Sequence, residues 1–196
     1  MSLKIIFKYS WIYDNIWKDY LVLKKGKSKI EFLSQKKIAN YTKIISKLWE
    51  KEGEKILKEI SNSSKLKWRR KQIICYIIGA GRSISDPLTI KVFKNKNDFI
   101  DLLIHELIHQ ILTQNKNQVS KYIKYLRRKY NDKSLTTQNH IILFAIYKKI
   151  MLKLFNKKRL NREFKRAERD REYLDAWKIM DEEGYENILK KFYEMI

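Results

Sequence analysis

The chain has 196 residues, enough for one domain with a substantial core, and its 44% hydrophobic and 13% aromatic content excludes an intrinsically disordered chain. One proline and five glycines in the whole length favour long helices over a sandwich of short strands and turns. The formal net charge of +22 points to polyanionic partners or to a lysine-rich surface, and we favour the surface because no nucleic-acid-binding motif accompanies the charge.

The first part of the chain contains a short apolar segment and then a long amphipathic one. Residues 3–9 predict a strand. The aromatic segment that follows, as far as Tyr20, either continues this strand or turns away from it. Between Ser34 and Ile60 apolar side chains recur at helical spacing, so we expect a long helix with Ser34 as its N-cap. The serine-rich residues 61–64 predict a loop after this helix.

Two further strands are expected in the middle of the chain. Residues 72–78 form a β-branched, apolar run, which is typical of a buried strand. Residues 88–93 alternate in a way that predicts a second strand, and the loop between the two contains the turn signal Asp86-Pro87. We expect this loop to bring the two strands together in antiparallel orientation.

The remaining segments are expected to be helical. The expected helices cover 95–113, 119–130, a stretch that Thr136 or Thr137 caps, 159–183, and a short final stretch after Gly184. The third is apolar on most sides, which indicates burial, whereas the fourth is highly charged and is expected to be solvated. These elements predict an α+β fold in one domain over residues 1–196. A small sheet and a central helix occupy 1–113, and a helical part occupies 114–196.

The cysteine content and the hydropathy pattern indicate in which cellular compartment the protein is expected. Cys75 is the single cysteine and cannot form an internal disulfide; its apolar neighbours favour a buried small hydrophobe over a nucleophile. Lys4 and Lys8 interrupt the N-terminal apolar residues, so we expect no signal peptide. No uncharged stretch is long enough to span a bilayer. We therefore expect an intracellular, cytoplasmic protein.

The segment His105-Glu106-Leu107-Ile108-His109 fits the pattern H-E-x-x-H inside the predicted helix 95–113. Histidines four residues apart lie one turn apart on the same helix face, so both imidazoles can reach one ion. Glu106 lies about 100° round the helix, close enough to act on a water at that ion. Since the chain has three histidines and the motif uses two, the pattern predicts that His105 and His109 bind zinc and that Glu106 is the general base.

His140 is the candidate third ligand. It is the other histidine of the chain and it opens the most apolar predicted helix, where an imidazole needs a partner. A hydrogen bond to a backbone carbonyl would also satisfy it. The alternative ligands are glutamates of the charged segment, which we expect to form surface ion pairs instead: Glu163, Glu168 and Glu172.

Together with the strand at 88–93, the motif resembles the zincin metallopeptidases over residues 72–113. In that family an edge strand holds the substrate backbone and the following helix carries the zinc ligands. The resemblance therefore implies that the strand at 88–93 pairs with an extended substrate. The resemblance implies a zincin-like fold, one Zn²⁺ per chain, a peptide or protein substrate, and proton transfer by Glu106. Leu112 and Asn115 stand where the metzincin pattern requires Gly and His, which leaves a gluzincin-like or a divergent three-histidine zincin.

Two alternatives to a peptidase remain open. The first is a zinc hydrolase that cleaves another kind of bond, because the motif dictates an activated water and not its target. The second is a non-enzymatic basic protein that binds nucleic acid or a protein partner. Supporting roles are expected for Asp101, which can orient His105, and for Tyr147, a candidate to stabilise an oxyanion. The oligomeric state stays open.

Overall fold

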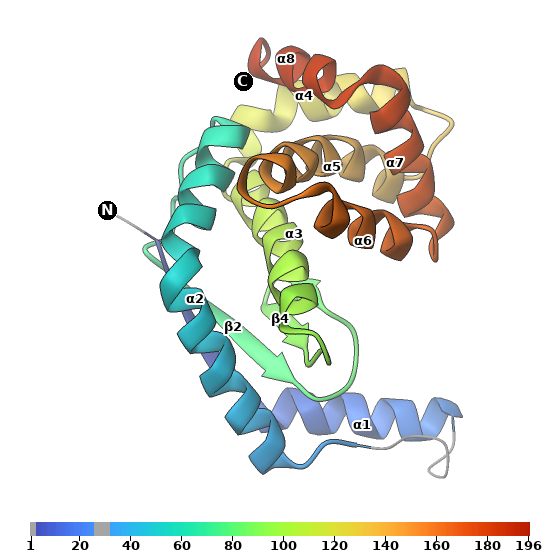
Figure 1. Ribbon diagram of the computed structural model, residues 1–196. Helices are drawn as coiled ribbons and strands as arrows, with labels where there is room; N and C mark the ends of the chain where they lie inside the picture. The colour runs from blue at the N-terminus through green and yellow to red at the C-terminus, as the bar shows by residue number, and fades with distance from the viewer. Residues whose placement is uncertain (1–2, 26–31) are drawn as a thin grey trace. The chain divides into compact units, whose positions relative to one another are not determined.

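The computed structural model (Figure 1) describes residues 3–25 and 32–196. These residues form two compact units. Unit 1 contains the described residues of Met1–Lys55 and Arg70–Glu106, and unit 2 contains Ile56–Arg69 and Leu107–Ile196. Unit 1 holds the sheet and unit 2 is helical, so the predicted α+β fold with a helical C-terminal half is confirmed.

The sheet of unit 1 has four strands in the order β1-β2-β4-β3. The strands are β1 (Lys4–Tyr9), β2 (Gln72–Ile78), β3 (Ile84–Ser85) and β4 (Leu88–Lys91). The strands expected at 3–9, 72–78 and 88–93 are thus present, but the expected antiparallel pairing of the last two is wrong. β2 pairs in parallel with both β1 and β4, whereas the short β3 forms the antiparallel hairpin with β4.

The hairpin also corrects the expectation that the strand at 88–93 is an edge that receives substrate. β4 lies between β2 and β3, and its residues Leu88 and Thr89 are already paired with Ser85 and Ile84. The backbone N–H of Lys91 donates to the Ser83 hydroxyl at 3.3 Å. An incoming peptide therefore finds the outer side of β4 covered.

The aromatic segment after β1 forms helix α1 (Trp11–Lys25) and does not continue the strand. The Ser10 hydroxyl accepts the backbone N–H of Tyr13 at 3.3 Å, as an N-cap does. One turn further, the buried carboxylate of Asp14 accepts the backbone N–H of Gly79 at 2.7 Å. This charge-assisted bond fixes the start of α1 to the loop that follows β2.

Helix α2 (Gln35–Ser64) matches the long amphipathic helix expected from the sequence, and the backbone N–H of Lys37 donates to Ser34 at 3.4 Å. The prediction of a loop at 61–64 is wrong, because α2 continues through these residues to Ser64. Ser63 donates to the Glu59 carboxylate and Ser64 donates to the Ile60 carbonyl, each at 2.7 Å. Serine hydroxyls that bond back to the preceding turn are compatible with a helix.

An aromatic cluster fills the core of unit 1. The ring of Phe7 lies 6.0 Å from Trp49 and 6.2 Å from Phe99, and Tyr41 lies 5.8 Å from Phe99. Cys75 is fully buried on β2. These side chains join the sheet to α2 and to helix α3 (Lys96–Gln114), the helix predicted at 95–113.

Unit 2 is built around the buried helix α5 (Leu135–Leu154), which contacts the other C-terminal helices (Figure 1). These are α4 (Lys116–Lys129), α6 (Lys157–Ala167), α7 (Arg171–Glu183) and α8 (Tyr185–Tyr193). The burial expected for this segment is confirmed, but its N-cap is Ser134, whose hydroxyl accepts the Thr137 N–H at 3.1 Å, and neither Thr136 nor Thr137.

The charged segment 159–183 is two helices, so the expectation of one long solvated helix is wrong. The side chain of Asp170 accepts the backbone N–H of Glu172 at 3.0 Å and starts α7. Ala176 and Trp177 are buried, because α7 packs against α5. The predicted break at Gly184 is confirmed, with a backbone φ of 78°. Among the helices that the structure describes, none is both long and apolar enough to cross a membrane.

Candidate metal centre

The H-E-x-x-H segment lies on α3, which runs without interruption from Lys96 to Gln114. Leu107 and Ile108, between the two histidines, are fully buried and hold the helix against its neighbours. His105 is buried and His109 is half-buried one turn further along the same helix face. The helix therefore presents both imidazoles in the same direction, as the spacing predicts.

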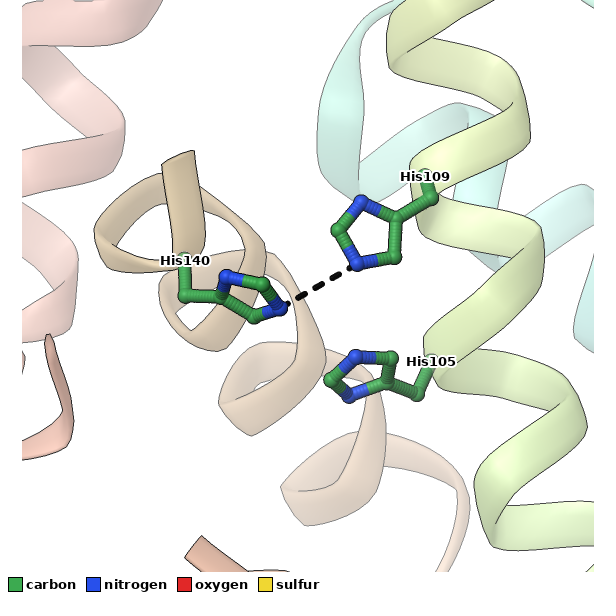
Figure 2. Close-up of side chains that lie close together, drawn as sticks. All are labelled: His105, His109 and His140. Atoms are coloured by element: carbon green, nitrogen blue, oxygen red, sulfur yellow. Dashed lines mark hydrogen bonds between the residues drawn. The ribbon is translucent and has the colours of Figure 1, made fainter. Parts of the chain in front are cut away.

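Three imidazoles meet at this point (Figure 2). One ligand atom from each of His105, His109 and His140 lies within 4.8 Å of the other two. The Nε2 atoms of His109 and His140 are 3.2 Å apart. In a tetrahedral zinc site with Zn–N bonds of about 2.0–2.1 Å, two ligand nitrogens lie about 3.3 Å apart. The observed separation is compatible with two nitrogens that share one zinc ion.

The orientation of His140 is set by its own helix. Its Nδ1 lies 2.7 Å from the backbone carbonyl of Thr136, and because a carbonyl only accepts, Nδ1 must carry the proton. The neutral ring then has its lone pair on Nε2, the atom that faces His109. A backbone carbonyl that fixes the tautomer in this way is a common partner of metal-binding histidines.

The same contact is also what a core histidine bonded to a carbonyl would show. Without a metal, Nε2–H of His109 can donate to Nε2 of His140 across the 3.2 Å gap. With a metal, His109 would take the other tautomer and both Nε2 lone pairs would point at the ion. The ring positions suit both states, so loading would require little movement of either side chain.

The alternative third ligands do not join the three imidazoles in the group of converging ligand atoms. Glu163 is buried on α6 and pairs with the partly exposed Arg166, so its expected ion pair exists but its carboxylate is not on the surface. Glu168 is exposed at the C-terminal end of α6, and Glu172 lies in the first turn of α7. Of the four candidates, the structure brings His140 to the motif.

Glu106 is buried, with 7% of its surface exposed, and lies close enough to β2 to influence Cys75. Burial, and to a lesser extent the Glu106 carboxylate, raise the pKa of the Cys75 thiol well above its usual range. Cys75 therefore stays a neutral thiol, and its prediction as a buried hydrophobe is confirmed. The general-base role of Glu106 stays a prediction.

A pocket of about 690 Å³ opens beside His109 and His140 in unit 2, and Tyr173 of α7 forms part of its wall. The Tyr173 ring lies 4.4 Å from the His140 ring, centroid to centroid. The sequence did not single out this tyrosine among the twelve in the chain. Tyr147, the one it suggested, is fully buried in α5 and is not part of this wall. The expected role of Asp101, which is also buried, stays a prediction.

Comparison with known proteins does not add to this picture. A scan against protein-family models found no matching family. Searches of the curated proteins and of the solved structures likewise found no match. The function must therefore be argued from the residues of the site itself.

Proposed function

We propose that the chain is a zinc-dependent hydrolase, and specifically a metallopeptidase of the three-histidine zincin type. The observation that carries the proposal is the convergence of His105, His109 and His140 on one point. Three imidazoles are a donor set that suits zinc, and three protein ligands leave a fourth position for water, as a catalytic site requires. A bound zinc ion would lower the pKa of that water and polarise the bond to be cleaved.

The side chains of the site would then share the work of hydrolysis. His105, His109 and His140 would hold the ion. Glu106 takes a proton from the attacking water and delivers it to the leaving amine. Tyr173 borders the same pocket as two of the histidines, so its hydroxyl is the natural donor to an oxyanion that forms there.

Metal analysis of the purified protein tests the ligand set. Mass spectrometry should find about one zinc per chain in the wild type and in Glu163→Ala, and little in His140→Ala. Glu163→Ala is the matched control, because Glu163 is also a buried polar residue of unit 2 and stands outside the imidazole cluster. A wild type that stays free of metal after zinc is added back would reduce the motif to a coincidence. The basic binding protein would then be the better description.

A second measurement tests the reaction. Glu106→Gln keeps the size of the side chain and removes its basicity, so zinc should stay bound while hydrolysis falls by at least about 100-fold. A panel of peptide, ester and amide substrates would separate a peptidase from another zinc hydrolase. Unchanged turnover in zinc-loaded Glu106→Gln would show that the assigned base is wrong.

A further inference from the structure

The pocket beside the histidines has a marked charge pattern. Three cationic side chains of α4 help to form its wall, namely Lys116, Lys124 and Arg127. None of the described residues that line this pocket is acidic. A concave site with charges of one sign attracts the opposite sign and disfavours cationic ligands.

The cationic residues are arranged along one face of α4. Their spacing of eight and eleven residues places all three within about 80° around the helix axis. At about 1.5 Å per residue, Lys116 and Arg127 are about 16 Å apart along that axis. An extended peptide advances about 3.3 Å per residue, so the row is as long as about five substrate residues.

The rest of the wall also suits a peptide. Three apolar side chains also line the pocket: Val119 is buried, and Leu112 and Ile123 are half-buried. Leu135, with 61% of its surface exposed, adds an apolar side chain at the rim. Among the described residues that line it, Tyr173 is the one aromatic ring besides the two imidazoles. A site that binds single-stranded nucleic acid typically offers a series of stacking rings.

We propose that this pocket is the substrate cleft and that it selects peptides with acidic side chains within about five residues of the cleaved bond. Lys116, Lys124 and Arg127 are the specificity residues, because all three cations and the histidine pair border one cavity. The proposal rests on the proposed peptidase function, but the charge selectivity of the pocket can be measured without any cleavage.

Binding of two matched peptides is the test. Both are ten-residue synthetic peptides with a zwitterionic rhodamine label, one with glutamate and its twin with glutamine at alternate positions. Fluorescence anisotropy is measured on full-length, zinc-loaded Glu106→Gln, in which the bound peptide is not consumed. The glutamate peptide should bind at least about tenfold more tightly than its twin at low salt, and the ratio should shrink as salt is added.

Two double variants, each made in the Glu106→Gln background, separate the pocket from the overall charge. Lys124→Gln with Arg127→Gln should lower the affinity for the glutamate peptide about tenfold. The affinity for the glutamine twin should stay within about twofold of its original value. Lys121→Gln with Arg128→Gln removes the same charges from exposed positions of α4 outside the pocket wall, and should change both affinities by less than about twofold. Equal losses in the two double variants, or no preference for glutamate, would overturn the proposal.

Two further measurements separate the acidic selectivity from the peptidase function and from binding of nucleic acid. If wild type cleaves both peptides equally well, the peptidase function stands and the acidic selectivity fails. If the pocket selects the glutamate peptide but zinc-loaded wild type cleaves neither, the selectivity stands and the peptidase function fails. A single-stranded oligonucleotide that displaces the peptide and depends more strongly on Lys124 and Arg127 would reassign the cationic row to nucleic acid.

Discussion

Zinc should stabilise the folded chain against heat, and the structure allows the effect to be sized. An ion held by His109 and His140 joins α3 to α5, two helices that are otherwise connected through α4 and the packing of unit 2. The Nε2 atoms of His109 and His140 already stand 3.2 Å apart, so little binding energy would be lost in moving this pair. A ligand present at 100 times its dissociation constant stabilises the state that binds it by about 2.7 kcal/mol. For a chain of this size, that corresponds to a rise in Tm of about 5–10 °C.

The assay is thermal unfolding followed by far-UV circular dichroism, with zinc in excess or with chelator. Each variant is compared with itself, so the packing lost in a substitution cancels from the zinc-dependent difference. In His140→Ala the two remaining ligands both lie on α3, and the ion no longer joins two helices. If affinity falls about 100-fold, the stabilisation at the same zinc concentration drops to about 0.4 kcal/mol, a shift of about 1 °C.

Glu163→Ala is the control for this experiment. It removes a buried carboxylate and its pairing with Arg166, so its melting temperature in chelator should fall. Its response to zinc should nevertheless match that of the wild type. Equal zinc shifts in wild type and His140→Ala, or no shift in the wild type, would refute the three-histidine ligand set.

Three further predictions concern the fold. Asp14→Ala removes the acceptor of the Gly79 N–H and should cost about 2–3 kcal/mol in denaturant unfolding, whereas the exposed Asp19→Ala should stay within about 0.5 kcal/mol. Ser134→Ala removes the N-cap of α5 and should cost about 1 kcal/mol in the same assay, and an unchanged midpoint would contradict the capping role. Because burial raises the pKa of Cys75, native protein at mildly alkaline pH should react with iodoacetamide far more slowly than unfolded protein, as followed by mass spectrometry.

The sequence correctly predicted the helices whose own hydrophobic pattern shows which face is buried. α3 and α5 carry apolar side chains at the spacing of a helix face or around most of the helix, so no distant partner is needed to identify them. α1 is different, because its position depends on the bond from Gly79 to Asp14, which are 65 residues apart in the sequence. Local propensity contains no information about such a partner.

The strand pairing failed for a related reason. An alternating pattern identifies a strand but does not say which neighbour it pairs with, or in which direction. The turn at Asp86-Pro87 was correctly read as a turn, yet it closes the hairpin between β3 and β4 and not one between β2 and β4. The two-residue β3 is too short to produce a pattern of its own.

The candidate metal centre combines both situations. The placement of His105 and His109 follows from helix geometry alone, and His140 could be proposed because it is the third of three histidines. No sequence pattern identified Tyr173 as a residue near His140. The contact between the two rings depends on the packing of α7 against α5, to which Ala176 and Trp177 contribute. The ligands and this part of the pocket wall are therefore held by different helices. Substitutions in α7 should change substrate binding or turnover while the zinc content is preserved. Substitutions of the histidines should lower both the zinc content and the turnover.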